Sequence, residues 1–316
     1  MISRSPARTP SPGTSPATSP ATNPGSGSRR VLWVSLGILL TAGATPLGSI
    51  SEHGLDAFDF SEEGGDQKRL SRRLEEISGL AMTAEGRVLA HNDERAVVYE
   101  LDPLSGDILK AFSAGVGGIP GDFEGIATVG HRLFLLTSSG DLVETTEGED
   151  GDAREYRVHR LGLSGLCEFE GLAFDPGHQS LLLPCKTTKK DRFKDHLVVL
   201  EVTLDPIRPY PIPRIFIPFE DLQRFDLKDR FHPSAIEVHP ETGRAFLLSA
   251  RQETILEVTT EGVLLAGREL RRKTHPQPEG ITFLRNGSLL LADEGQGKRG
   301  RITLYEAKSG EEGSLP

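Results

Sequence analysis

The chain has 316 residues, with 36 lysines and arginines against 46 aspartates and glutamates. Residues 1–48 hold four arginines and no acidic residue, so the remaining chain carries 32 basic and 46 acidic residues, a formal charge of −14. This acidic body argues against binding to a nucleic-acid backbone, which requires stripes of lysine and arginine. The 35 glycines and 21 prolines favour many short strands over long helices.

The first 48 residues differ in composition from the rest of the chain. Residues 1–30 are rich in Ser, Pro, Thr and Gly, a composition that buries too little apolar surface to fold and predicts a disordered basic leader. Residues 31–48 are apolar, follow Arg29-Arg30 and contain the small-residue stretch Ala42-Gly43-Ala44, which predicts a signal peptide cleaved after Ala44. An uncleaved membrane anchor is an alternative, although the segment is short for a span of about 20 residues, and a misassigned start codon would also explain the long leader.

Each of these three readings places residues 49–316 outside the cytoplasm. We expect a periplasmic or other extracytoplasmic protein, either free or anchored in the inner membrane. No later segment of the sequence is long and apolar enough to cross a bilayer. Contact with the membrane is therefore expected only through residues 31–48.

A pentapeptide recurs five times in residues 49–316. Its copies occupy residues 77–81, 123–127, 169–173, 233–237 and 278–282, and their central Gly or Ala residues are 46, 46, 64 and 45 residues apart. A period in the forties is typical of solenoids and of β-propellers. The first copy begins four short apolar runs separated by turn residues, over 77–82, 87–90, 96–101 and 107–112, and such a unit is a four-stranded antiparallel sheet.

Radial repetition of this unit predicts an all-β protein with a β-propeller fold. We expect five four-stranded blades in a single domain, residues 49–316. The last unit lacks a fourth strand, and Leu55–Phe60 is expected to supply it from the N-terminal side and close the ring. The third unit is longer and contains the Pro-rich stretch 205–218, so six blades is the alternative if a degenerate unit lies there. The acidic run 147–152 predicts a solvated hairpin tip.

The repeat also predicts a polar site at one end of the channel. The residue before each central Gly or Ala starts a first strand, and the second strand ends beside it in an antiparallel pair. These positions hold five carboxylates, which are Asp93, Glu124, Glu170, Glu279 and Asp293, together with the hydroxyls of Ser78, Ser138, Ser234 and Ser249. The nearby cations are Lys186 and Arg251.

Carboxylates that converge without matching cations raise one another's pKa, and protonation or a hard cation relieves the repulsion. An oxygen-rich site suits Ca²⁺, so we expect the five carboxylates to bind a divalent cation. The alternative is structural, with the Glu side chains bonded to backbone amides and the Asp side chains capping turns.

Two cysteines occur in the chain, Cys167 and Cys185. The first lies four residues before Gly171 and the second fourteen residues after it, which places them at neighbouring strand ends of one blade. In an exported chain this arrangement favours a disulfide; two buried free thiols are the alternative.

The motifs together resemble the SdiA-regulated (YjiK-like) β-propeller family. The resemblance is carried by residues 76–81, 121–127, 169–173 and 277–281 and by the strand ends 92–93 and 292–294. It implies an exported or membrane-anchored propeller that binds calcium, with Glu124, Glu170, Glu279, Asp93 and Asp293 lining the channel. Members of the family are sometimes likened to phytase-like or esterase-like propellers. The sequence departs from the pattern in the fourth copy, where Ser234-Ala235 replaces Glu-Gly.

Three functions are consistent with these patterns. The first is a calcium-binding propeller that acts as a binding or regulatory module. The second is a metal-dependent hydrolase of phosphate esters or lactones, with Glu124, Glu170 or Glu279 as base and Lys186 or Arg251 holding an anionic small molecule. The third is an interaction propeller for an envelope protein, without chemistry. We rank binding above hydrolysis because a phosphate site needs more than two cations, and whether the protein is an enzyme stays open.

Overall fold

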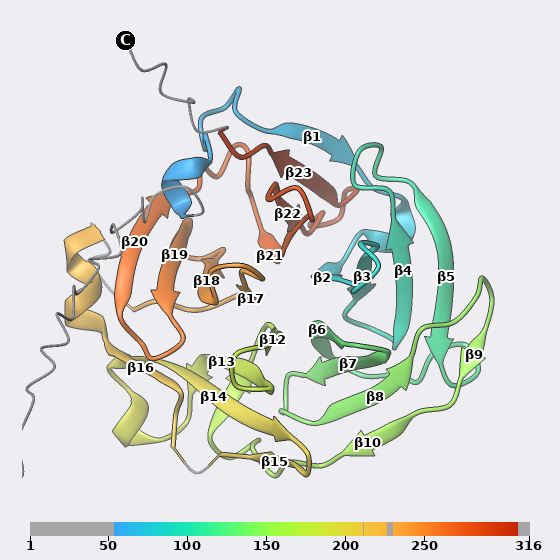
Figure 1. Ribbon diagram of the computed structural model, residues 1–316, viewed down its shortest axis with the longest axis horizontal. Coiled ribbons are helices and arrows are strands. Elements are labelled where there is room, and N and C mark those ends of the chain that lie inside the picture. The colour runs from blue at the N-terminus through green and yellow to red at the C-terminus, as the bar shows by residue number, and fades with distance from the viewer. Residues whose placement is uncertain (1–53, 211, 226–229, 309–316) are drawn as a thin grey trace, which may run out of the picture. The chain divides into compact units, whose positions relative to one another are not determined.

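The protein folds into five antiparallel sheets arranged as blades around a central axis, as expected for a β-propeller (Figure 1). This computed structural model describes residues 54–210, 212–225 and 230–308. The expected leader and the signal or anchor segment lie outside the described residues. Among the residues that are described, no helix is long and apolar enough to span a membrane.

Each blade begins with a strand beside the axis and continues outward. Blade 1 contains β2 (Ile77–Met82), β3 (Val88–Asn92), β4 (Val97–Leu101) and β5 (Ile108–Ala114), and blade 2 contains β6 (Phe123–Val129), β7 (Arg132–Thr137), β8 (Leu142–Thr146) and β10 (Arg157–His159). Blade 4 contains β17 (Ala235–Val238), β18 (Arg244–Ser249), β19 (Thr254–Thr259) and β20 (Leu264–Glu269). Blade 5 contains β21 (Pro278–Phe283), β22 (Leu289–Asp293) and β23 (Arg301–Tyr305), and β1 (Asp66–Arg69) completes it.

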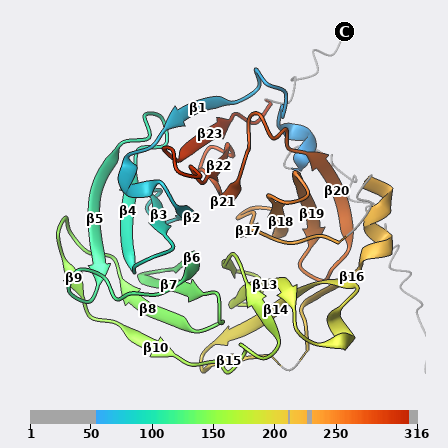
Figure 2. The same cartoon turned by 180° about the vertical axis from the view of Figure 1, so that it is seen from behind.

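The N-terminal closing strand is confirmed, but its predicted position was wrong. β1 pairs with β23 at the outer edge of blade 5 (Figure 1 and Figure 2). Leu55–Ala57 instead forms a short 3₁₀ helix, η1, and Leu55 and Phe58 are buried between blades 4 and 5. The apolar pattern of this segment therefore comes from packing in the core. The true closing strand is almost fully solvated and has no apolar alternation to reveal it.

The long third unit is a single elaborated blade, so the six-blade alternative is wrong. Its first strand is broken into β11 (Cys167–Phe169) and β12 (Ala173–Asp175), which both pair with β13 (Ser180–Thr188). β14 (His196–Leu204) then pairs with β15 (Ile207–Pro209) over one half and with β16 (Ile215–Pro218) over the other. The insertion thus divides the outermost position of the blade between two short strands. Three further 3₁₀ helices are η2 (Arg72–Leu74), η3 (Asp191–Phe193) and η4 (Phe219–Phe225).

The acidic run 147–152 is not a free hairpin tip. Glu147 pairs with Arg87 at 2.6 Å and with Lys110 at 2.5 Å, which are both residues of blade 1. The next residues form β9 (Ala153–Arg154), which pairs in parallel with β5. The segment therefore fastens blade 2 to the outer edge of blade 1.

Buried apolar side chains fill the space between neighbouring blades. The described residues contain one such cluster at each of the five blade interfaces. Each sheet is thus covered on both faces, which explains the nearly continuous apolar runs within the inner strands. Cys167 and Cys185 form a disulfide between β11 and β13, with their Cα atoms 5.4 Å apart.

Candidate functional site

The central residues of the pentapeptides bring the first strands of neighbouring blades into close contact at the axis. A Cβ atom added to Gly125 would lie 2.6 Å from the backbone nitrogen of Leu172, and one added to Gly171 would lie 2.9 Å from the Cα of Ala235. Only glycine fits at these two approaches. The constriction divides the channel into two ends, which differ in chemistry.

The first end, called here the carboxylate end, holds Glu124, Glu170 and Glu279. Glu124 and Glu279 lie at β-bulges, where the pairing of β6 with β7 and of β21 with β22 skips one residue. A bulge releases a residue from the ladder and redirects its side chain. In blade 3 the first strand breaks at the equivalent point, between β11 and β12, where Glu170 lies. In the fourth blade, the first two strands have no bulge, because β17 and β18 pair in continuous register.

Burial and the charges of neighbouring carboxyl groups raise the pKa of Glu124 and of Glu279. Burial raises the pKa of Glu124 to about 9, and the charges of Glu170, Asp122 and Glu279 add to the rise. Burial, with the charges of Glu294 and Glu170, raises the pKa of Glu279 to about 8. The three groups are therefore near enough to interact electrostatically, and they resist simultaneous ionisation.

Lys186 supplies the positive charge at this end. Its ammonium group pairs with the carboxylate of Glu170, and the pair limits the burial-driven rise in the pKa of Glu170 to about 7. Burial opposes ionisation of Lys186, but the hydrogen bond to Glu170 and the charges of Glu170 and Glu124 leave its pKa raised. Arg251 is exposed to solvent, and its charge contributes to the lowered pKa of His232, after burial.

Asp293 does not join this group. It is fully buried in blade 5, where Oδ2 lies 2.8 Å from Nδ1 of His275 and Oδ1 accepts a hydrogen bond from the backbone of Gln277 at 3.2 Å. The other ring nitrogen of His275 lies 2.6 Å from the hydroxyl of Tyr305. This buried chain of hydrogen bonds ties the last strands of blade 5 together and leaves neither Asp293 oxygen directed to the channel.

Asp93 belongs to a second acidic set at the same end. Its pKa is raised by burial and by the charges of Glu94 and Asp122, and it raises the pKa of Glu76 and Glu294. Its Oδ1 is buried and has no hydrogen-bond partner within the described residues. The five predicted ligands are thus distributed over three places: the triad of glutamates, Asp93 beside it, and Asp293 inside a blade.

The hydroxyl groups predicted at this end make local hydrogen bonds. Ser234 donates to the carbonyl of Pro278 at 2.6 Å, which links blades 4 and 5. The others donate within or next to their own turns, Ser78 to Glu76, Ser138 to Asp122 and Ser249 to Gln252.

The carboxylate oxygens at the carboxylate end suit a hard cation, because hard cations such as Ca²⁺ bind oxygen ligands. The arrangement is not a preformed metal site: in residues 54–210, 212–225 and 230–308, no three His, Cys, Asp or Glu side chains are grouped closely enough to hold a metal ion. The ammonium of Lys186 already satisfies Glu170. A metal ion would have to draw Glu124 and Glu279 together and release this lysine.

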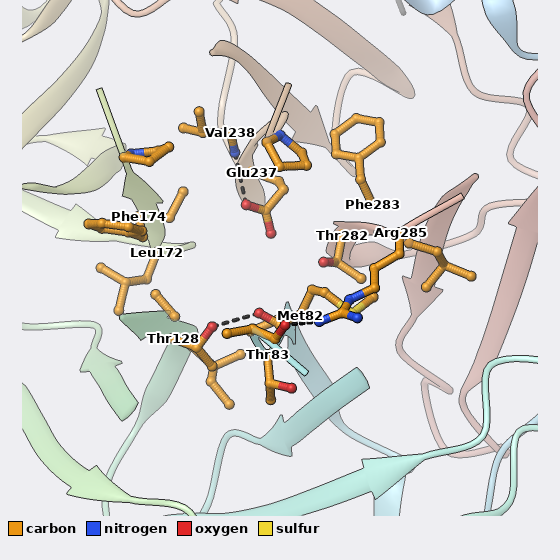
Figure 3. A pocket seen from close by; sticks show the side chains of 18 of the residues that line it. Met82, Thr83, Thr128, Leu172, Phe174, Glu237, Val238, Thr282, Phe283 and Arg285 are labelled. Atoms are coloured by element: carbon orange, nitrogen blue, oxygen red, sulfur yellow. Dashed lines mark hydrogen bonds between the residues drawn. The ribbon is translucent and has the colours of Figure 1, made fainter. Parts of the chain in front are cut away.

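The second end, called here the apolar end, is a cavity of about 390 Å³ (Figure 3). It is lined by the ends of β2, β6, β12, β17 and β21 and by the turns that follow them. Glu237 points into it among apolar side chains, and burial raises the pKa of this carboxyl to about 8. We did not predict this site. The signal was present, because Glu237 occupies a pentapeptide position that is alanine in the first three copies.

The sequence profile of the SdiA-regulated family matches residues 63–297. The chain belongs to the SdiA-regulated family. This confirms the resemblance carried by the pentapeptides, and the match spans most of the propeller.

Two solved structures are similar to the chain at low sequence identity. Glutaminyl cyclase from Myxococcus xanthus is 15% identical, with a TM-score of 0.50 over 76% of this chain and 93% of that one. A Trichoderma reesei carbohydrate-active enzyme of family AA12, solved in a calcium structure, is 10% identical, with a TM-score of 0.46 over 79% of this chain and 97% of that one. No curated protein matches the chain. At such identities the structural likeness extends to the fold alone.

Proposed function

We propose that this SdiA-regulated propeller is a binding or regulatory module whose carboxylate end takes up a cation. The observation that carries the proposal is the convergence of Glu124, Glu170 and Glu279. The charge of Glu170 raises the pKa of both other carboxyl groups, and Glu170 itself pairs with the ammonium of Lys186. Three carboxyl groups near one ammonium leave a negative excess whenever they ionise. A bound cation would remove that excess and so stabilise the folded protein.

Calcium is the cation we propose first. It accepts six to eight oxygen ligands in flexible geometry, which suits carboxylates on separate blades. Glu124 and Glu279 would hold it, with Glu170 joining once Lys186 turns away. Extracellular calcium modules bind with dissociation constants of about 10⁻⁴–10⁻³ M, so a site that needs this rearrangement is adequate outside the cell. The disulfide between Cys167 and Cys185 supports such a location, because disulfides persist in oxidising compartments.

Hydrolysis of anionic substrates is not part of this proposal. Lys186 is paired with Glu170, and its other neighbours are carboxylates. Arg251 is exposed to solvent. A phosphate ester approaching this end would therefore meet a negative field, with its main cation already engaged.

The test is thermal unfolding of the full-length chain during a titration with CaCl₂, with EDTA as the metal-free reference. We expect calcium to raise the melting temperature in the wild type, since binding at about 100 times the dissociation constant adds about 2.7 kcal/mol. Glu124→Gln and Glu279→Gln should lose this response. Glu237→Gln, at the opposite end of the channel, is the matched control and should keep it. A wild-type melting temperature that is the same in calcium and in EDTA would refute calcium binding.

A further inference from the structure

The apolar end of the channel has the dimensions of a small-molecule site. Its volume of about 390 Å³ falls in the range of roughly 300–1,000 Å³ for such pockets. All five blades contribute to the walls, and Met82, Leu172, Phe174 and Phe283 supply apolar side chains (Figure 3). The constriction at the motif glycines separates this pocket from the carboxylate end.

Glu237 is the acid of this pocket, and it projects toward the interior from β17 (Figure 3). It accepts a hydrogen bond from the backbone nitrogen of Val238 at 2.9 Å. The part of the chain that the structure describes gives Glu237 no ion pair, and the lining's cation, Arg285, donates to the carbonyl of Ala84 instead. The carboxyl group therefore has acceptor capacity that the protein does not use.

Thr282 provides a second observation. It is fully buried and lines the pocket, and its hydroxyl has no hydrogen-bond partner among the described residues. The hydroxyl lies near enough to oppose the rise in the pKa of Glu237, but it does not reach hydrogen-bond geometry. Figure 3 shows both side chains turned toward the middle of the pocket, where neighbouring atoms cover that of Thr282. A buried polar atom without a partner costs free energy, which a ligand that supplies the partner recovers.

The repeat shows that these polar groups are departures from the fold's own pattern. The fifth residue of the pentapeptide is Ala81, Ala127 and Ala173 in the first three blades, Glu237 in the fourth and Thr282 in the fifth. All five residues line the pocket. The three alanines leave room in the channel, and the two polar residues stand next to each other on blades 4 and 5. The propeller fold does not require a carboxyl group at this position, since three blades form without one.

We propose that this pocket binds a small apolar amine, whose ammonium group pairs with Glu237 while its apolar body lies against Met82, Leu172 and Phe174. An ammonium group donates hydrogen bonds to the carboxylate and balances its charge, and the proton of Glu237 leaves to solvent when the ion pair forms. An anionic ligand would place like charges together. A metal ion would find one carboxylate where it needs several oxygen ligands.

The experiment is calorimetric titration of the full-length chain with three probes of nearly equal size: 2-phenylethylamine, 2-phenylethanol and phenylacetate. We expect the amine to bind one molecule per chain, at least about tenfold more tightly than the alcohol, which corresponds to about 1.4 kcal/mol. We expect phenylacetate to bind more weakly than either. Equal affinities for amine and alcohol, or no amine binding, would overturn the proposal.

Three variants locate the site. Glu237→Gln should reduce amine affinity at least about tenfold, to that of the alcohol. Ala173→Leu should abolish binding of both probes by filling the pocket from its wall, and it serves in place of the first variant if that one does not fold. Glu124→Gln, at the carboxylate end, should leave amine binding unchanged. Amine binding that is lost in Glu124→Gln but kept in Glu237→Gln would assign the amine to the other end and refute this proposal without affecting the calcium test.

Discussion

Replacement of Glu124 by glutamine tests whether the carboxyl groups of the carboxylate end destabilise the protein when they ionise. Glu124 has a pKa of about 9 in the folded chain, against an ordinary value of 4.5. Between these values the folded protein retains a proton that the unfolded chain has released. The contribution of Glu124 to the free energy of unfolding is therefore greatest at low pH and falls as the pH rises from about 4.5 toward about 9. Glutamine has nearly the same shape and cannot ionise.

The size of the effect follows from the proton linkage. One bound proton changes the free energy of unfolding by about 1.36 kcal/mol per pH unit, so Glu124 alone accounts for up to about 2.7 kcal/mol over two pH units. Partial exposure of the side chain to solvent weakens the interaction. We therefore expect the wild type to lose about 1–2 kcal/mol between pH 5.5 and 7.5 through this group.

The assay is urea unfolding of wild type and Glu124→Gln at a series of pH values, with EDTA present throughout. The two proteins should have nearly equal free energies of unfolding near pH 5, and the variant should be more stable by about 1.5–3 kcal/mol near pH 8. Glu63→Gln, which removes an exposed acid, is the control and should follow the wild type. An unchanged pH slope in Glu124→Gln, or a variant less stable than wild type near pH 8, would refute this reasoning.

Two further predictions concern the framework that positions the site. Gly125→Ala should destabilise the protein by about 2 kcal/mol or more, because the added Cβ would lie 2.6 Å from the backbone nitrogen of Leu172. The control is Gly165→Ala, which has open space around it and should change the free energy of unfolding by less than about 1 kcal/mol. Equal effects of the two variants in urea unfolding would contradict the close-packing argument. Reduction of the disulfide between Cys167 and Cys185, which are 18 residues apart, should lower the free energy of unfolding by about 3 kcal/mol. Urea unfolding with and without reductant measures this change, and a protein equally stable in both conditions would show that the crosslink does not contribute.

The blades could be predicted because the pentapeptide combines two local requirements. Its central Gly or Ala permits the close approach of the first strands, and its apolar residues fill the interfaces between blades. The closing strand β1 could not be placed in the same way. An outer strand solvated on both faces carries no periodicity, whereas the apolar residues near Leu55 are buried without forming a strand.

The sequence by itself determined the β-propeller fold, with five blades favoured over six, and the positions of Glu124, Glu170 and Glu279 at one end of the channel, because spacing fixes where along a strand a residue lies. Only the tertiary structure decided which side chains meet. Asp293 occupies the expected strand end, yet its carboxylate is turned into blade 5 toward His275. Side-chain direction depends on bulges and on the packing of neighbouring strands, and burial depends on what the other blades contribute. The departure of Glu237 from the alanine of the first three copies is visible in the sequence, but the pocket that it lines exists only because five first strands close around it.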